Sequence, residues 1–457
     1  MKSSAGPPAL NDPETSTGGS RGFVILALAF CALLGLSVAC GDVAEDAPKS
    51  AETPPPATKP LIREPTTPDD LPLALVLGLS AFAERQPGET GMPVPLAAEL
   101  EFIARRGGEW VKTTLTDSDS NVFHKALVYE KPDGTLALLT GGGSKAIVKL
   151  WTKQDGQLVS QTLWEKDFGG RFSRIRDIEV GDIDGNGTNV IVVATHDQGI
   201  VALIRPKDGG YEVEEIDSQE DTFVHEIELG DMDGDGELEI YATPSEPNRL
   251  DGSSQSGHVV RYRPSQNEGR VVVADLGERH AKEILVHDID GDGKDELYVI
   301  VEGQKNPKGS GLLHRTEIWR YEFDTPADQG VVIAELDDRF GRFLTPSDLN
   351  GDGKKEIVVA LYQKGIWWLR PGEDPTKPWR KRAIDRRSGS FEHATIAIDL
   401  DGDGVQELYV ASDNDKALRR YVWNGRRLVK EEIYERSDNR SILTWNIMPI
   451  PVELVPE

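Results

Sequence analysis

Short runs of apolar and β-branched residues, separated by turns rich in Gly, Asp and Asn, recur along the chain from about residue 100. Each run is short, and many alternate apolar with polar positions, which is typical of β-strands and not of helices. One stretch shows three of them in succession: NVIVVAT at 189–195, GIVALIRP at 199–206 and YEVEEID at 211–217. This pattern predicts an all-β fold.

Five acidic segments of one pattern divide these runs into units. They begin at Asp182, Asp231, Asp288, Asp348 and Asp399, and are separated by 49, 57, 60 and 51 residues. An apolar or alternating run precedes each segment, and strand-like runs follow it, so each unit contains four short strands. A unit of four strands that repeats about every 50 residues is the sequence signature of a β-propeller blade.

Further units are found once this period is known. Residues 128–140 form a degraded copy with Tyr129 at the first motif position, and residues 98–106 and 109–116 resemble the last two strands of a blade. At the C-terminal end, residues 439–450 repeat the run that precedes a motif. We therefore predict a seven-bladed β-propeller of four-stranded antiparallel blades over residues 100–457. Both chain ends would close the last blade, which leaves no open sheet edge.

The spacing of acids in these segments is that of a loop that binds a hard cation. In the second segment Asp231, Asp233 and Asp235 occupy positions 1, 3 and 5, Gly236 permits a sharp turn, and Glu239 stands at position 9. Oxygen donors without Cys or His favour Ca²⁺ over zinc or copper. An EF-hand is excluded because its loop needs a glutamate at position 12, where all five segments have an apolar residue of the following predicted strand. The candidate calcium ligands are Asp182, Asp184, Asn186, Asp231, Asp233, Asp235, Glu239, Asp288, Asp290, Asp292, Glu296, Asp348, Asn350, Asp352, Glu356, Asp399, Asp401, Asp403 and Glu407.

The five motif copies resemble the FG-GAP/VCBS family, the bacterial relatives of the integrin α-subunit propeller. The resemblance covers roughly residues 100–457 and implies a β-propeller with up to five structural Ca²⁺ ions in the loops joining the first two strands of successive blades. The family includes adhesion modules, polysaccharide lyases and dehydratases. The fold alone therefore does not determine the function.

The N-terminal region has a different hydrophobic pattern. Phe23 to Ala39 form one apolar run shortly after Arg21, and Cys40 follows it. This arrangement resembles a bacterial lipoprotein signal peptide, in which residues 1–39 are removed and Cys40 is lipidated. The alternative is an uncleaved membrane anchor, since 17 apolar residues approach the length of a span. Both interpretations predict an extracytoplasmic protein attached to a membrane, facing the periplasm or the cell surface.

Two segments separate this region from the predicted propeller. Residues 40–70 are rich in proline and predict a disordered tether. Residues 71–99 are a lead-in segment, in which the apolar stretch 71–83 fits either a helix or a strand.

The composition argues against a nucleic-acid partner and against a disulfide framework. Lys and Arg number 51 against 78 Asp and Glu, a formal net charge of −27. Such a charge repels phosphate backbones, so we expect no nucleic-acid partner. The chain has only two cysteines, both within the first 40 residues, which excludes a disulfide framework.

One further pattern is a set of basic or imidazole side chains at equivalent positions of successive units, which we call the basic column. Such a residue stands six positions before each acidic motif, and related positions occur in the degraded and C-terminal units. They form either interblade ion pairs or a cationic ring at one mouth of the central channel, among apolar neighbours such as Ile178 and Ile227. The histidines would make anion binding stronger below about pH 6.5. The column comprises Arg176, His225, Lys282, Arg342, His393, Arg440 and His124.

These observations predict a calcium-binding β-propeller that serves as an interaction module. An anionic glycan or a protein partner would bind at the ring. The alternative is a carbohydrate-active enzyme, a polysaccharide lyase or a sugar dehydratase, that uses the same ring. No conventional hydrolase or metalloprotease motif (GxSxG or HExxH) occurs in the chain, and no catalytic residue is assigned.

Overall fold

The computed structural model describes residues 67–84, 93–169, 173–245, 253, 255–437 and 440–457. Within the chain, Pro60–Glu457 form one compact unit. The expected signal peptide, Cys40 and most of the expected tether lie outside the described residues. In the part that the structure describes, no helix is long and apolar enough to cross a membrane.

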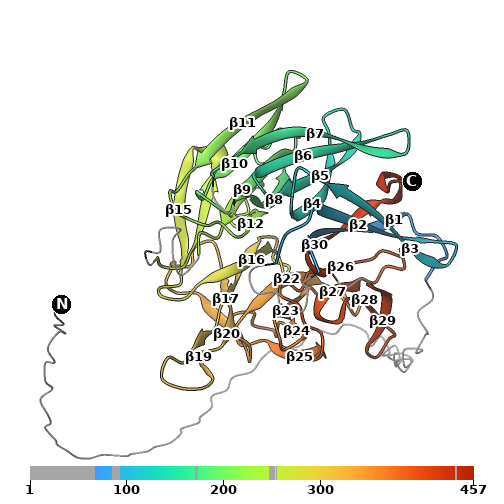
Figure 1. Cartoon of the computed structure of the whole chain (residues 1–457). Helices are drawn as coiled ribbons and strands as arrows, with labels where there is room; N and C mark the ends of the chain where they lie inside the picture. Colours follow the sequence, from blue (N-terminus) through green and yellow to red (C-terminus); the bar gives the residue numbers. More distant parts are fainter. Residues whose placement is uncertain (1–66, 85–92, 170–172, 246–252, 254, 438–439) are drawn as a thin grey trace, which may run out of the picture. The chain divides into compact units, whose positions relative to one another are not determined.

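The unit is a seven-bladed β-propeller, as the sequence predicts (Figure 1). Every blade is a four-stranded antiparallel sheet, and the first strands of neighbouring blades contact one another around the central channel. The first three blades in the sequence are blade 1, with β4 (Phe123–Glu130), β5 (Leu136–Gly142), β6 (Ala146–Gln154) and β7 (Gln157–Lys166); blade 2, with β8 (Ile175–Gly181), β9 (Val190–Thr195), β10 (Val201–Lys207) and β11 (Gly210–Asp217); and blade 3, with β12 (Ile227–Gly230), β13 (Glu239–Ala242), β14 (His258–Arg263) and β15 (Glu268–Asp275).

The next three blades follow the same order, with one insertion. A two-stranded hairpin, β18 (Gln304–Lys305) and β19 (Leu312–His314), separates the second and third strands of blade 4. The strands are, in blade 4, β16 (Ala281–His287), β17 (Glu296–Val301), β20 (Thr316–Tyr321) and β21 (Val331–Leu336); in blade 5, β22 (Gly341–Ser347), β23 (Glu356–Leu361), β24 (Ile366–Arg370) and β25 (Arg380–Asp385); and in blade 6, β26 (Thr395–Ile398), β27 (Glu407–Ser412), β28 (Ala417–Trp423) and β29 (Leu428–Glu435). Three short 3₁₀ turns complete the described elements: η1 (Pro264–Gln266), η2 (Asp413–Asp415) and η3 (Val452–Leu454).

Blade 7 is built from both ends of the described chain. Its innermost strand is β30 (Ser441–Pro451), followed by β1 (Leu73–Phe82), β2 (Ala98–Arg106) and β3 (Glu109–Asp117). β30 pairs with the full length of β1. The apolar stretch 71–83, for which the sequence allowed a helix or a strand, thus forms the second strand of the closing blade.

The hydrophobic core is divided among the seven junctions between adjacent blades. Each junction has its own cluster of buried side chains, because alternate residues of a strand point to opposite faces of its sheet. Between blades 6 and 7, for example, Leu77 and Leu79 of β1 pack in one cluster with Tyr409 of β27. Trp368 and Trp379 are likewise buried in clusters of this kind. Packing between blades thus fixes where each first strand faces the channel.

Candidate metal sites and the central channel

The five acidic segments all lie between the first and second strands of a blade, in blades 2 to 6. In blade 3, Asp231 follows the last residue of β12 directly, and Glu239 is the first residue of β13. Glu296, Glu356 and Glu407 begin the second strands of blades 4, 5 and 6 in the same way. The loop begins where the first strand ends, and the glutamate at position 9 begins the second strand. Because these two strands are neighbours in the sheet, the glutamate lies beside the first residue of its own loop.

Hydrogen bonds hold the loop of blade 3 in a tight turn. The carboxylate of Asp231 accepts hydrogen bonds from the backbone N–H groups of Gly234 (2.8 Å), Asp235 (3.0 Å) and Gly236 (2.9 Å). Gly234 and Gly236 have φ values of 76° and 89°, in the left-handed region that favours glycine. Glu239, which is 2% exposed, accepts from the N–H of Met232 at 3.0 Å.

Three of the loops bring carboxylate oxygens to within 4.8 Å of one another. The largest group is in blade 4 and combines three aspartates with Glu296; the other two are in blades 3 and 6. Burial, together with repulsion from Asp290, raises the pKa of Glu296 to about 7, and burial is also the main reason that Glu356 reaches about 8. One buried oxygen of Glu356, Oε2, has no hydrogen-bond partner among the described residues. Crowded, desolvated oxygens of this kind fit a Ca²⁺ ion.

The loops of blades 2 and 5 offer fewer carboxylate ligands to a cation. Asn186 and Asn350 replace an aspartate at position 5 and position 3, respectively, and Val190 takes the place of the glutamate in blade 2. Neither loop brings three acidic side chains to within 4.8 Å among the described residues. Fewer negative charges in the loop predict weaker calcium binding.

In three blades, an arginine on the third strand reaches into the acidic loop, a feature that was not predicted from the sequence. Arg205 donates to Asp184 (2.9 and 3.1 Å), Arg263 forms ion pairs with Asp233 and with Asp235 (3.3 Å), and its Nε lies 3.5 Å from Glu239. The third member, Arg320 of blade 4, forms an ion pair with Asp290 at 2.7 Å. An arginine near the end of the third strand in blades 2, 3 and 4 is the sequence signal that could have revealed them.

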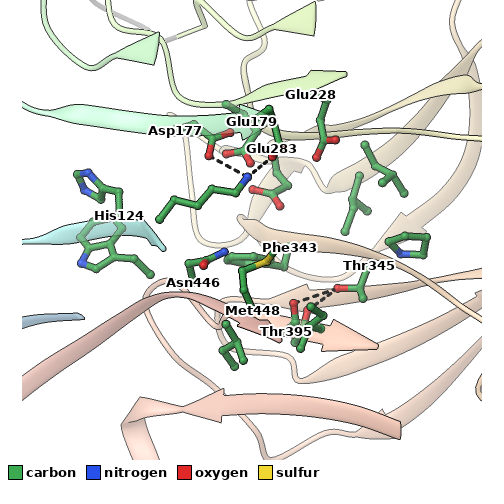
Figure 2. A pocket seen from close by; sticks show the side chains of 18 of the residues that line it. His124, Asp177, Glu179, Glu228, Glu283, Phe343, Thr345, Thr395, Asn446 and Met448 are labelled. Atoms are coloured by element: carbon green, nitrogen blue, oxygen red, sulfur yellow. Dashed lines mark hydrogen bonds and ion pairs between the residues drawn. The ribbon is translucent and has the colours of Figure 1, made fainter. Parts of the chain in front are cut away.

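The central channel contains a cavity of about 370 Å³ lined by residues from the first-strand region of all seven blades (Figure 2). Blades 2, 3 and 4 supply most of the carboxylates of this cavity. Blades 5, 6 and 7 supply mainly uncharged side chains such as Phe343, Thr345 and Met448, together with one carboxylate, Glu392, which precedes β26. Thr345 and Thr395 are hydrogen-bonded to each other at 2.6 Å. The cavity therefore has an acidic side and a mostly uncharged side.

The acidic side surrounds one lysine. Lys125 of β4 forms ion pairs with Asp177 (3.0 Å) and with Glu179. Both acids are labelled in Figure 2. The structure here differs from the expectation of apolar neighbours: Ile178 and Ile227 are fully buried in the clusters between blades. Acidic residues of the first-strand regions of blades 2, 3 and 4 face the channel instead. They were not predicted from the sequence, and they are Asp177, Glu179, Glu226, Glu228 and Glu283.

Burial raises the pKa values of three of these acids, Glu226, Glu228 and Glu283. Burial, together with repulsion from Asp177, raises the pKa of Glu283 to about 8, although Arg176 opposes the shift. The pKa values of Glu226 and Glu228 are also well above the ordinary range, again mainly through burial. Glu283 is therefore largely protonated and neutral at pH 7.

Three members of the basic column meet at one end of the channel. Arg176, Lys282 and Arg342 are each the second residue of a first strand, so they lie at the end opposite the acidic loops. Two aromatic rings join them. The Arg176 guanidinium lies 5.1 Å and the Lys282 ammonium 6.0 Å from the ring of Trp445. Lys282 and Arg342 lie 5.5 and 4.7 Å from the ring of Phe391.

Glu392 is the counter-ion of this group, which we call the cationic mouth (Arg176, Lys282 and Arg342). Its carboxylate lies 3.1 Å from Lys282 Nζ and 3.8 Å from Arg342 Nη2. Burial alone would raise the pKa of Glu392, but the charges of Lys282, Arg342 and Arg176 lower it to about 2. Arg342 also lies 3.7 Å from Glu302 through its Nη1. Two carboxylates thus face three cations.

The other members of the column have different positions. His225 lies beside the mouth, with its Nδ1 3.4 Å from Arg176 Nε, and His124 packs edge-on against Trp445. His393 is fully buried and bonded to Ser388 and to the carbonyl of Leu361, both at 2.7 Å. Burial lowers the pKa values of His124 and His393, so these two do not provide the expected titration near pH 6.5.

Arg440 lies apart from the cationic mouth. It donates to Glu99 of β2, at 2.5 and 3.3 Å. It therefore serves as an ion-pair partner within blade 7.

Comparisons with known proteins agree with this architecture. Residues 348–410, which run from the acidic loop of blade 5 to β27 of blade 6, match the family model of the FG-GAP-like repeat. The chain is thus a β-propeller with an FG-GAP-like repeat, an architecture that suggests an interaction module. No curated protein matches the chain.

Two solved structures have a similar fold. The first is a protein of Bacteroides fragilis NCTC 9343 assigned provisionally as a 6-phosphogluconolactonase, with 12% identity and a TM-score of 0.48 over 85% of this chain and 100% of that one. The second is the Dos1 propeller, with 10% identity and a TM-score of 0.46 over 69% of this chain and 71% of that one.

Proposed function

We propose that this protein is an extracytoplasmic, lipid-anchored interaction module that binds an anionic group of a glycan or protein partner at the cationic mouth. One observation carries the proposal: Arg176, Lys282 and Arg342, from three different blades, gather around Trp445 and Phe391 at one end of the channel. Attachment through Cys40 follows from the sequence of the N-terminal region.

The charge balance of the mouth favours an anion. Glu392 is ionised and Glu302 lies 3.7 Å from Arg342, but Glu283 of the adjoining cavity has a pKa of about 8 and is mostly neutral at pH 7. The local charge is therefore positive in a protein of formal net charge −27. Arg342 is 6% exposed, and a partly desolvated cation attracts an anion more strongly than one in bulk water. An arginine can also grip a carboxylate or sulfate with two parallel hydrogen bonds.

Calcium has a structural part in this proposal. The acidic loops lie at the opposite end of the first strands from the cationic mouth. Ions bound there would connect the first and second strands of blades 2 to 6. They would neutralise crowded carboxylates without touching the ligand.

The test is a glycan array probed with the full chain in the presence of Ca²⁺. We expect retention on uronate-containing and sulfated glycans, loss at high salt, and little retention on neutral ones. An Arg176→Ala, Arg342→Ala double variant should lose this retention while its melting curve shows a folded protein. Equal retention on acidic and neutral glycans, or a folded double variant that binds as the wild type does, would contradict the proposal.

A further inference from the structure

A groove lies beside the cationic mouth, at the same end of the propeller. It has a volume of about 1010 Å³ and three walls: the β18–β19 hairpin, residues 337–340 and residues 362–364. Residues 337–340 run directly into β22, the first strand of blade 5, and residues 362–364 join β23 to β24. Both segments therefore lie where β22 begins, next to Arg342.

Backbone hydrogen bonds join these three walls. The N–H of Gly303, just before the hairpin, donates to the carbonyl of Arg339 at 2.7 Å, and the N–H of Tyr362 donates to the carbonyl of Phe340 at 3.0 Å. The buried carboxylate of Asp338 accepts from the N–H groups of the two residues after Tyr362, at 2.7 and 2.9 Å. The groove is thus a built part of the fold and not a gap between independent loops.

The side chains of the groove are basic overall. Lys305 and Lys364 are exposed, and in the described part of the chain neither has an ion pair. Arg315 is paired with Asp337 at 3.1 Å, and Asp338 is occupied by backbone N–H groups. Two unpaired lysines therefore remain, and the complete set of charged residues is Lys305, Arg315, Arg339, Lys364, Asp337 and Asp338.

A row of aromatic rings connects the groove with the mouth. The ring of Tyr362 lies 6.0 Å from that of Phe340 in the groove and 6.2 Å from that of Phe391 at the mouth. Phe391 is 44% exposed. Cations lie over both ends of the row, with Arg339 at 4.4 Å from Phe340 and Arg342 at 4.7 Å from Phe391.

We propose that this groove is an extended subsite for an acidic oligosaccharide whose terminal carboxylate occupies the cationic mouth; the inference rests on the function proposed above. The apolar faces of successive sugar rings would pack on Phe391, Tyr362 and Phe340. Their carboxylates would pair with Lys364 and Lys305. A chain of sugars satisfies both features because it carries an apolar ring face and a negative charge in each repeat.

Other polyanions satisfy fewer of these features. Duplex nucleic acid would present many more phosphates to a protein of net charge −27. An acidic peptide offers carboxylates but no rings to pack on the aromatic row. The observations therefore favour the glycan, and the peptide becomes an outcome of the test.

The test measures binding of a hyaluronan octasaccharide and of free glucuronate by calorimetry, with the full chain and Ca²⁺. The octasaccharide spans groove and mouth, whereas the monosaccharide occupies the mouth alone. A Lys305→Ala, Lys364→Ala double variant should bind the octasaccharide about tenfold more weakly, because two exposed ion pairs with the ligand are lost. Its glucuronate affinity should equal that of the wild type. The matched control is Lys377→Ala, Arg426→Ala, which removes two exposed cations outside the groove and should change neither affinity.

The binding results distinguish a wrong assignment of the groove from a wrong assignment of the mouth or of the ligand class. Unchanged octasaccharide affinity in the Lys305→Ala, Lys364→Ala variant, with glucuronate still bound, overturns the groove and leaves the cationic mouth intact. No binding of glucuronate by the wild type overturns the function proposed for the mouth. If poly-L-glutamate binds as tightly as the octasaccharide with the same dependence on the two lysines, the ligand class is an acidic peptide and the glycan assignment is wrong.

Discussion

Arg436 donates a hydrogen bond to Glu101 across 335 positions of the sequence, at 3.0 Å. The two side chains are 4% and 2% exposed, and they join the end of blade 6 to β2 of blade 7. Arg436 also pairs with Asp413 at 3.0 Å and donates to Thr444 of β30 at 3.2 Å. One guanidinium thus connects the two chain ends that form the closing blade.

This network predicts a large effect of the Glu101→Gln substitution on stability. Removing one partner of a buried ion pair typically costs about 3–5 kcal/mol. Because Asp413 still pairs with Arg436 in the variant, we expect a loss at the lower end of this range. We expect a correspondingly lower free energy of unfolding in urea at pH 7. Glu109→Gln, an exposed position on β3, is the matched control and should change little. A Glu101→Gln variant as stable as this control would contradict the assigned role.

The effect should depend on pH in a defined direction. Burial alone would raise the pKa of Glu101, but the charge of Arg436 and hydrogen bonds from Arg436 and Tyr434 lower it overall. Its stabilising contribution is therefore complete at neutral pH and is lost as the pH falls through the lowered pKa, below about pH 4. The stability difference between wild type and Glu101→Gln should shrink over that range.

The sequence predicted the blade count and the acidic loops because both depend on local, repeated patterns. It could not decide between helix and strand for residues 71–83, because an apolar stretch of that length fits either and the partner of β1 is β30, more than 350 residues away. The acids of the channel were missed for a related reason. Packing between blades decides which face of a first strand meets the channel. In addition, the basic residues stand beside a register shift, such as that between Ile175 and Asp177, so the alternation of faces cannot be counted through them from the sequence.

Chelation of calcium should lower the melting temperature. Extracellular loops of this kind bind Ca²⁺ with dissociation constants of about 10⁻⁴–10⁻³ M. A site filled at 10 mM Ca²⁺ would therefore stabilise the fold by roughly 1–3 kcal/mol. Addition of EDTA should lower the melting temperature by several degrees, measured by circular dichroism. A melting curve that is indifferent to EDTA would contradict structural calcium.

Asp292→Asn tests the strongest loop separately from the fold. With Ca²⁺ present the variant should melt earlier than the wild type, because a charged ligand is lost. In EDTA it should be at least as stable, because repulsion within the group of Asp288, Asp290 and Glu296 is relieved. Asp184→Asn in the weak loop of blade 2 is the control and should show no calcium-dependent difference. The same shift for both variants would contradict the ranking of the loops.

Arg263→Ala should increase the calcium affinity of the blade 3 loop. The guanidinium of Arg263 pairs with Asp233 and Asp235 and repels a divalent cation bound between them. Removing a partly buried like charge is worth about 1 kcal/mol, so we expect about fivefold tighter binding. Terbium luminescence of the Asp292→Asn background, in which the blade 4 loop is weakened, would report it. Unchanged or weaker binding would show that Arg263 supports the loop and does not compete with the ion.

The last prediction concerns the cationic mouth at alkaline pH. Burial and the charges of Arg342 and Arg176 lower the pKa of Lys282 to about 8, although Glu392 opposes the shift. Glu283 has a pKa of about 8 as well, through burial and repulsion from Asp177. Raising the pH from 6.5 to 9.5 therefore removes a positive charge from Lys282 and adds a negative charge to Glu283.

Both changes weaken the attraction for an anion, so glucuronate affinity should fall by about tenfold or more across this range. A Glu283→Gln variant keeps the neutral form at every pH, and its affinity should fall less steeply.

The Glu283→Gln variant should also unfold at a higher temperature than the wild type at pH 9. The raised pKa means that the folded wild type binds more protons than the unfolded chain, and its stability drops as the pH rises from about 4.5 towards 8. Calorimetric titrations at pH 6.5, 7.5 and 9.5 test the first expectation and melting curves the second. An affinity that stays constant, or that rises with pH, would show that neither Lys282 nor Glu283 sets the charge that the ligand meets.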